Sequence, residues 1–458
     1  MDVDDAHRPS NAFSGRAFPH AAAIAMKLSA TLLLALMLLG LAGCRKDDDT
    51  TGPSVTILAP GAGAQLQIPG EVTVRAAVSD DRQVTTVRFT VLDPQGIPVV
   101  GSASVAVDAA SADVERTLAL NDEALRSGAY TIMVTAHDGS NESRAYRALT
   151  VVEAPLRLRA VYAVSAVGGQ TAVLRIDSTG AAAPFATLDQ DVRHAVFSTR
   201  SRALVIAGDV SGPVTALDAE LGTVRWQLPN TNAFGSTFFT GLDRIDDDRL
   251  LIGRSDGELR AVAAFSGSGF FTALALDGRY PRRQAALGGR LLSEQPLVAG
   301  NGRRLVLYTA YTGELLAERP LDLVLAGFAA LDDDRVLLFG ERAGDGVVQE
   351  LHVDLGGGWE PQALSGQAIR GVASAPGQVH YLATSTGLLR YSYSTNTVQS
   401  LIAGPALEVI GRDAVSGAVY IATTGQVQRV DPGSGAILQS WPLSGTAVAL
   451  LPCYNREP

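Results

Sequence analysis

An apolar segment recurs along the last two-thirds of the chain, and this repetition constrains the fold more than any other feature. Successive copies begin roughly 38 to 46 residues apart, the size of one four-stranded blade of a β-propeller. The copies begin near Ala195, Gly241, Ala285, Gly327, Gly371, Ile410 and Val448. Glycine is abundant, with 47 residues in 458, as short strands joined by tight turns require. The repetition predicts an all-β chain with a β-propeller of about seven blades over residues 155–458.

The last copy, which begins at Val448, is followed by too few residues to build a whole blade. Three further strands are expected before the first copy, at Leu158–Val164, Ala172–Ile176 and Ala183–Leu188. We expect the C-terminal strand to complete their blade as its inner strand. Joining strands from both ends of the chain removes the open sheet edges and closes the ring.

One blade carries a recognisable motif. Residues 216–226 read Ala-Leu-Asp-Ala-Glu-Leu-Gly-Thr-Val-Arg-Trp. This segment resembles the PQQ-like, quinoprotein-type repeat AxDxxTGxxxW, with Leu221 in place of threonine. Residues 430–435 with Trp441 form a looser copy, and residues 311–313 a fragment. The resemblance implies that Asp and Gly form the turn between the outer strands and that Trp packs on a neighbouring blade. It implies a fold rather than a chemistry.

Residues 54–153 show a different pattern, with seven short segments of alternating apolar and polar residues. Clusters of Gly, Pro, Asp and Asn separate them, which predicts an immunoglobulin-like β-sandwich. The segments are Ser54–Leu58, Glu71–Val78, Thr85–Leu92, Ala103–Val107, Glu115–Leu120, Tyr130–Ala136 and Ala145–Val152. Residues 128–139 resemble the penultimate strand of bacterial Ig-like and cadherin-like modules. Four polar residues are open to two interpretations, calcium ligands or turn formers: Asp80, Asp81, Asp138 and Asn141.

The N-terminal region has the features of a targeting signal. Residues 28–42 form a nearly continuous apolar run after Lys27, too short to span a bilayer comfortably. The run ends in Leu-Ala-Gly-Cys at Cys44, which resembles the bacterial lipobox. The resemblance implies that Cys44 receives diacylglycerol and that residues 1–43 are a signal peptide, with Met26 as the true start. Several acyl chains on one protein anchor it permanently to the lipid bilayer.

Residues 44–53 join the lipid to the first domain. The run Lys46, Asp47, Asp48 and Asp49 resembles the acidic export signal that sends certain lipoproteins to the outer face of the outer membrane. We therefore expect an outer-membrane protein exposed at the cell surface. The alternative is a solvated linker on a lipoprotein that faces the periplasm.

Composition excludes several kinds of chemistry. The chain has 47 acidic and 37 basic residues, a net charge of −10, which argues against nucleic-acid binding. The two cysteines, Cys44 and Cys453, provide neither a disulfide framework nor a thiolate metal site. Residues 253–257 match the GxSxG pattern, but they lie between two expected strands rather than on a strand-to-helix elbow. We expect no catalytic residue, no metal and no cofactor, since the adjacent cysteines of quinoproteins are also absent.

The longest loops of the propeller indicate a ligand face. Residues 229–237 and 277–283 flank the inner strand of one blade, on the side where propellers usually bind ligands. Aromatic rings beside arginine and asparagine suit protein hot spots or sugar faces. The candidate residues are Asn232, Phe234, Arg279, Tyr280 and Arg282.

The expected function is that of a non-catalytic binding or scaffold lipoprotein. Its propeller would bind an unknown protein or glycan, and its Ig-like domain would serve as a spacer or adhesion module. One alternative is a periplasmic outer-membrane assembly factor resembling the propeller lipoprotein of the barrel-assembly machine. Another is a propeller-type enzyme such as a lactonase, a lyase or a glycan-active protein.

Overall fold

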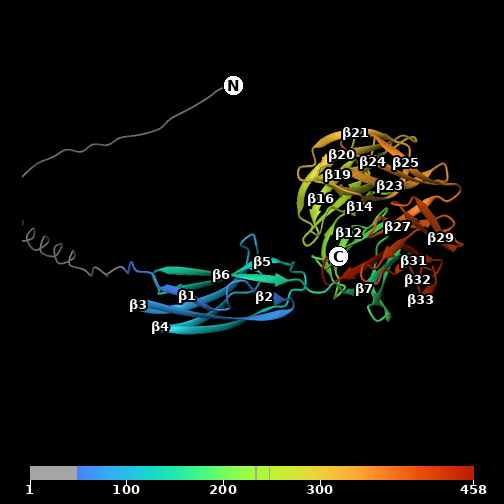
Figure 1. Ribbon diagram of the computed structural model, residues 1–458. Coiled ribbons are helices and arrows are strands. Elements are labelled where there is room, and N and C mark those ends of the chain that lie inside the picture. Colours follow the sequence, from blue (N-terminus) through green and yellow to red (C-terminus); the bar gives the residue numbers. More distant parts are fainter. Residues whose placement is uncertain (1–48, 233–234, 247) are drawn as a thin grey trace, which may run out of the picture. The chain divides into compact units, whose positions relative to one another are not determined.

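The computed structural model describes residues 49–232, 235–246 and 248–458 (Figure 1). These residues form strands and loops, and the predicted all-β class is confirmed for them. No helix within these ranges is long and apolar enough to cross a membrane. The chain divides into two compact units, which are taken in turn below. The first contains the described residues up to Ala64, Glu71–Leu118 and Ala129–Leu149, and the second contains the remainder.

Six strands form the N-terminal sandwich: β1 (Ser54–Ala59), β2 (Ala64–Gln67), β3 (Gly70–Leu92), β4 (Ala103–Leu120), β5 (Gly128–His137) and β6 (Glu142–Val152). The strand order is β1-β3-β5-β6-β2, and β4 pairs with β3. The first part of β3 pairs with β1 and its last part pairs with β5. Alternate residues of these strands are buried, among them Val74, Phe89 and Ile132. This period of two places one face of each strand in the core.

The seven predicted segments of this region become fewer, longer strands. Two of them merge into β3 and two into β4, and β2 was not predicted. The stretches that join them, residues 79–84 and 108–114, contain aspartate and serine but neither glycine nor proline. Without such a residue, nothing in the backbone forces the ladder to end. The β2 segment, Ala-Gln-Leu-Gln, is too short and polar to stand out in the sequence.

In the second unit, the described residues form seven four-stranded sheets. The first four sheets are β10 (His194–Ser198), β11 (Ala203–Ala207), β12 (Val214–Asp218) and β13 (Val224–Leu228); β14 (Phe239–Arg244), β15 (Arg249–Arg254), β16 (Glu258–Ala263) and β17 (Gly269–Leu274); β18 (Arg283–Leu287), β19 (Arg290–Pro296), β20 (Arg303–Thr309) and β21 (Leu315–Leu321); and β22 (Val324–Ala330), β23 (Arg335–Arg342), β24 (Asp345–His352) and β25 (Gly358–Leu364). The last three are β26 (Ile369–Ala375), β27 (Val379–Thr384), β28 (Gly387–Ser392) and β29 (Thr397–Ala403); β30 (Ile410–Arg412), β31 (Val419–Thr423), β32 (Gln426–Val430) and β33 (Ile437–Pro442); and β34 (Thr446–Tyr454), β7 (Leu158–Val167), β8 (Gln170–Asp177) and β9 (Ala182–Leu188).

The sheets follow one another around a closed ring, which is a β-propeller (Figure 1). The first strand of each sheet contacts the first strand of the next, and β34 contacts β10. The C-terminal strand β34 pairs antiparallel with β7, from Thr446 beside Ala166 to Tyr454 beside Leu158. The two ends of the propeller thus share one sheet, so no sheet edge interrupts the ring.

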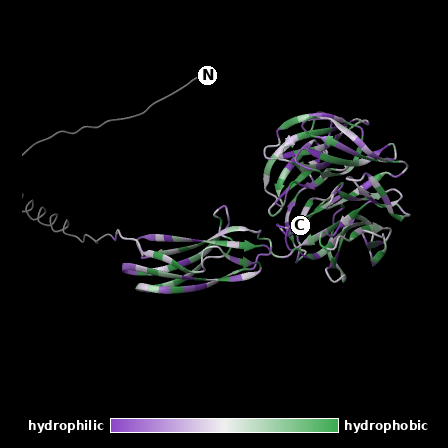
Figure 2. Cartoon of the chain, viewed as in Figure 1, coloured by the Kyte–Doolittle hydropathy of each residue, from purple (hydrophilic) through white to green (hydrophobic). Residues whose placement is uncertain are grey.

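The middle strands of the sheets carry the core. All five residues of β11 are buried, while the outer strands alternate between buried and exposed positions. Apolar side chains from neighbouring sheets pack between them, for example Val205, Leu250 and Ile252. Figure 2 shows the hydrophobic residues along the strands and the hydrophilic ones in many of the connecting loops. Burial of both faces of each middle strand accounts for the continuous apolar runs that repeat in the sequence.

The motif residues take the roles that their resemblance implied. Asp218 Oδ1 accepts hydrogen bonds from the backbone N–H groups of Glu220 and Leu221, both at 2.8 Å, and Gly222 has φ of 69°. Trp226 Nε1 donates to the carbonyl of Ala264 in the next sheet at 3.0 Å. In the looser copy, Trp441 Nε1 likewise donates across sheets, to the Gly180 carbonyl at 2.8 Å. These bonds tie neighbouring sheets together at their outer turns.

The GxSxG match lies in a hairpin between β15 and β16, as predicted. Gly257 has φ of 91°, a conformation that glycine adopts without strain. The segment lacks the strand-to-helix elbow on which a hydrolase nucleophile is exposed.

Candidate functional site: a polar channel in the propeller

A cavity of about 390 Å³ lies where the first strands of four successive sheets face one another. We call it the channel cavity. Its polar wall comes from the end of β14 and the start of β18, and its opposite wall from small or apolar residues of β22 and β26. The lining residues that matter below are Asp243, Arg283, Gln284, Ala326 and Phe328. Small-molecule sites have cavities of this size, and most of the exposed surface of this one is polar.

The side-chain amide of Gln284 lies in this wall without a hydrogen-bond partner among the described residues. The residue is only 4% exposed, yet neither Nε2 nor Oε1 has a hydrogen-bond partner among the described residues. Its backbone N–H donates to Asp243 Oδ2 at 2.9 Å. The amide fits because residue 241 is glycine, since a Cβ there would lie 2.6 Å from Nε2. A buried amide without partners costs free energy, so its presence calls for a ligand or a solvent partner.

Arg283 brings a cation to the same wall. Its Nε has no hydrogen-bond partner, and its guanidinium makes no ion pair with any described residue. Burial lowers the pKa of Arg283, and the nearby Asp243 carboxylate opposes this effect. Burial also raises the pKa of Asp243 above its ordinary value, although Arg283 and Arg282 act in the opposite direction. The two groups therefore influence each other without forming a direct ion pair.

Arg282, the residue before Arg283, forms an ion pair with a buried carboxylate. Its Nε donates to Glu294 Oε2 at 2.9 Å, and Arg303 Nη1 donates to Glu294 Oε1 at 2.9 Å. Glu294 is completely buried on β19. One carboxylate thus balances two guanidinium groups, which leaves a positive charge in the wall beside the channel.

A histidine from a third strand completes the polar group. Burial, followed by the charges of Arg283 and Arg193, lowers the pKa of His194 well below its ordinary value. Its ring is therefore neutral at physiological pH. The His194 Nε2 atom has no partner among the described residues.

The nominated residues that the structure describes do not line the channel cavity, and several of their N–H groups donate to nearby backbone carbonyls. Arg279 Nη1 donates to the carbonyls of Gln295 and Gly302, each at 3.0 Å. The Tyr280 backbone N–H donates to the Pro296 carbonyl at 3.3 Å. Asn232 Nδ2 donates to the Ser236 carbonyl at 2.7 Å, and Phe234 lies outside the described residues.

Sequence reasoning missed the residues that line the cavity. Asp243, Arg283 and Gln284 line it and come from two strands, while His194 approaches Arg283 from a third strand without lining the cavity. The nominated Arg282 directly precedes Arg283. One signal was present in the sequence. The strand β18 opens with Arg-Gln directly after Arg282, whereas β22 and β26 open with Val-Leu and Ile-Arg. Polar residues entering an inner strand mark the point at which that strand lines a polar space.

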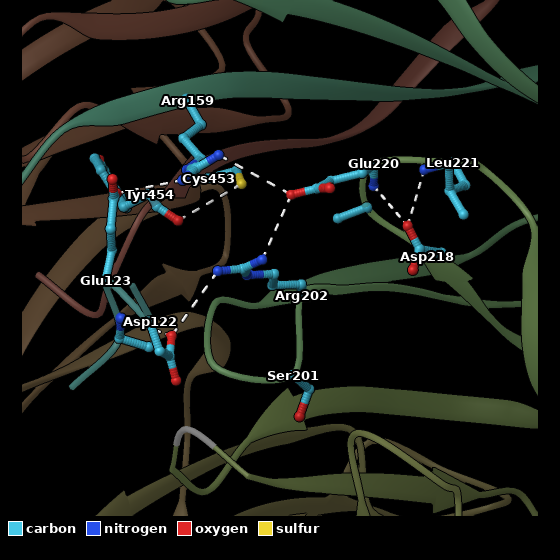
Figure 3. Close-up of polar contacts among 12 residues, drawn as sticks. Asp122, Glu123, Arg159, Ser201, Arg202, Asp218, Glu220, Leu221, Cys453 and Tyr454 are labelled. Carbon is cyan, nitrogen blue, oxygen red and sulfur yellow. Dashed lines mark hydrogen bonds and ion pairs between the residues drawn. The ribbon is translucent and has the colours of Figure 1, made fainter. Parts of the chain in front are cut away.

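A second cavity of about 570 Å³, also in the second unit, contains arginines in a different setting (Figure 3). Arg159 and Arg202 both approach Glu220, at 4.0 and 3.6 Å. Arg159 also pairs with Glu123 at 3.3 Å. Cys453 lies buried in this cavity, and burial raises the pKa of its thiol to about 12. A thiol that stays protonated at neutral pH is a poor nucleophile.

The predicted lipid site and most of the export segment fall outside the described residues. This applies to Cys44, Lys46, Asp47 and Asp48. Asp49 is described, and its carboxylate accepts the Thr51 N–H at 3.1 Å and pairs with Arg82 at 3.6 Å. Asp49 also lies beside Asp80 and Asp81, with ligand oxygens within 4.8 Å of one another. Exposed carboxylates often gather without an ion, so the calcium interpretation stays open.

Residues 53–134 match a family model described as bacterial Ig domain. This match supports the predicted Ig-like module. No curated protein matches the chain. Among solved structures, BamB from Moraxella catarrhalis is 17% identical, over 57% of this chain and 91% of that one, with a TM-score of 0.39. A quinoprotein alcohol dehydrogenase-like protein from Bacteroides thetaiotaomicron is 10% identical, over 88% and 97%, with a TM-score of 0.42.

Proposed function

We propose that this chain is a lipid-anchored, non-catalytic binding protein whose seven-bladed propeller takes up a small ligand in the channel cavity. The Ig-like domain serves as a spacer or adhesion module between the lipid on Cys44 and the propeller. The observation that carries the binding role is the channel cavity, whose polar wall contains a buried amide without partners.

The anchor and its position require their own experiment. Cys44→Ser should abolish incorporation of radiolabelled palmitate and release the protein from membranes. Replacement of Lys46, Asp47, Asp48 and Asp49 by alanine should leave lipidation intact but move the protein to the periplasmic side. Protease treatment of intact cells, with a periplasmic protein as leakage control, distinguishes these positions. If the alanine variant stays as exposed as wild type, the export signal is wrongly assigned.

Binding in the channel is tested with the purified protein and a library of sugars, amino acids, nucleosides, carboxylates and phosphate esters. Thermal unfolding should shift upward with at least one compound. Ala326 lines the cavity, and Ala326→Trp should fill it and remove the shift. Ala182→Trp adds the same side chain at an exposed position of β9 and should keep the shift. A folded wild-type protein that responds to no compound in the library contradicts the binding role.

A further inference from the structure

We infer that the channel cavity binds the oxyanion group of a small molecule, a carboxylate or a phosphate, with Arg283 as its principal partner. This inference rests on the proposed binding function and names the chemical class of the ligand.

The charge around the cavity is the first argument. Arg244, which lines the cavity, is balanced by Glu457 at 3.0 Å. Besides this pair, four arginines and three acidic residues belong to the polar wall or to the ion pairs connected to it: Arg193, Arg282, Arg283 and Arg303, with Asp209, Asp243 and Glu294. The excess is positive, although the whole chain has a net charge of −10. A local positive excess in an acidic protein attracts anions into the cavity and repels cations.

The state of Arg283 is the second argument. The other three arginines of this group each pair with a carboxylate within 3.3 Å, whereas Arg283 makes no ion pair with any described residue. Because Arg283 lines the cavity and no carboxylate pairs with it, its guanidinium is available to a ligand. Its planar set of N–H donors matches the two oxygens of a carboxylate or phosphate.

Hydrogen-bond donors beside Arg283 are the third argument. The Gln284 amide offers N–H donors that no described residue uses. Anion sites in proteins combine a guanidinium with neutral donors in this way.

The opposite wall limits what the rest of the ligand can be. It contains Ala326, Gly327, Phe328 and Val372, and no charged residue is among the described residues that line it. A cavity of about 390 Å³ therefore fits a small molecule with its anionic group at Arg283 and an uncharged portion against Phe328.

The test is calorimetric titration of the dialysed protein with inorganic phosphate and with succinate, at low ionic strength. Wild type should bind at least one of these anions, and Arg283→Gln should weaken that binding at least tenfold. Arg202→Gln, which removes an arginine from the second cavity, is the matched control and should bind as wild type does. Arg283→Lys, which keeps the charge but loses the planar fork, should fall between wild type and Arg283→Gln.

Two results would overturn the inference. The first is binding of neither anion to wild-type protein. The second is equal binding to wild type and to a folded Arg283→Gln variant, with circular dichroism as the check on folding. If a neutral library compound binds and Ala326→Trp abolishes this binding while both anions fail, the oxyanion assignment is wrong and the proposed binding function stands.

Discussion

The channel cavity and the second cavity of the propeller both contain arginines, but the two cavities differ in how these arginines are paired with carboxylates. In the second cavity, Glu220 lies between Arg159 and Arg202, so each of these two guanidinium groups has a carboxylate beside it (Figure 3). Arg175, which also lines that cavity, makes no ion pair with any described residue and lies beside the Tyr162 hydroxyl. In the channel, Arg283 makes no ion pair with any described residue, and the adjacent Gln284 amide has no partner there either.

This difference separates structural charges from functional ones. A paired arginine satisfies its own surroundings, and its carboxylate is often retained for that reason alone. An arginine in a cavity wall that no carboxylate pairs with keeps its N–H donors available for an anionic ligand. The second cavity is therefore interpreted as structural and the channel cavity as the binding site.

The largest expected effect concerns Glu294, the buried carboxylate that holds Arg282 and Arg303 beside the channel. Glu294→Ala leaves two guanidinium groups without their partner and should lower the free energy of unfolding by about 3–5 kcal/mol. Glu220→Ala in the second cavity affects more exposed pairs and should cost about 1 kcal/mol or less. Urea unfolding measures both, and equal losses would remove the distinction between the cavities.

The pH dependence of stability provides the next test, because His194 belongs to the channel group and no histidine lines the second cavity among the described residues. The pKa of His194 is lower in the folded state than in the unfolded state. The unfolded chain therefore takes up a proton as the pH falls below about 6.5, and the folded protein does not. The free energy of unfolding of the wild-type protein therefore decreases as the pH falls.

Between pH 7.5 and pH 5, His194→Gln should lose about 2 kcal/mol less stability than wild type. The shifts of Asp243 and His380 are present in both proteins and cancel in this comparison. Urea unfolding of both proteins at the two pH values gives the difference. Identical losses would show that the imidazole takes up its proton in the folded channel.

The position of the Gln284 amide depends on Gly241, where a Cβ would also lie 2.7 Å from the Arg282 carbonyl. Gly241→Ala should therefore lower the free energy of unfolding by about 1–2 kcal/mol and weaken anion binding. Gly269→Ala is the control, since a Cβ at that position meets no atom within 4 Å. A Gly241→Ala variant as stable as this control would show that the amide is free to move.

The smallest expected effect comes from a direct comparison of Arg283, which has no ion pair, with Arg202, which has one. Arg283→Met removes a cation without a partner and should leave the stability of the anion-free protein unchanged or raise it by about 1 kcal/mol. Arg202→Met removes a paired and half-exposed cation and should lower stability by about 0.5 kcal/mol. Thermal unfolding in an anion-poor buffer ranks the two variants. The opposite ranking would assign Arg283 a structural role.

The repeated apolar strands could be predicted because each one is buried on both faces, whatever its neighbours are. Each predicted copy begins within the first strand of a sheet, and the closing position of Val448 followed from chain length alone. In the Ig-like region, the alternating pattern located most buried strands, but it could not show that polar stretches continue the same strand.

The channel could not be predicted in the same way. His194, Asp243 and Arg283 are separated by roughly forty residues each, and only closure of the ring brings their strands together. Loop length pointed to residues 277–283, but the residues nominated on that loop ended at Arg282, one residue short of the cavity wall. Whether an arginine has a carboxylate partner is a property of the folded protein, and no pattern in one sequence reports it.

The most direct test of the account is diffraction from crystals grown with selenate, an anomalous scatterer that mimics an oxyanion. The account predicts an anomalous peak in the channel cavity, within hydrogen-bonding distance of the Arg283 guanidinium. It predicts no peak beside Arg159 or Arg202, because carboxylates already occupy their donors. A peak in the second cavity with none in the channel, or no peak in either, would contradict it.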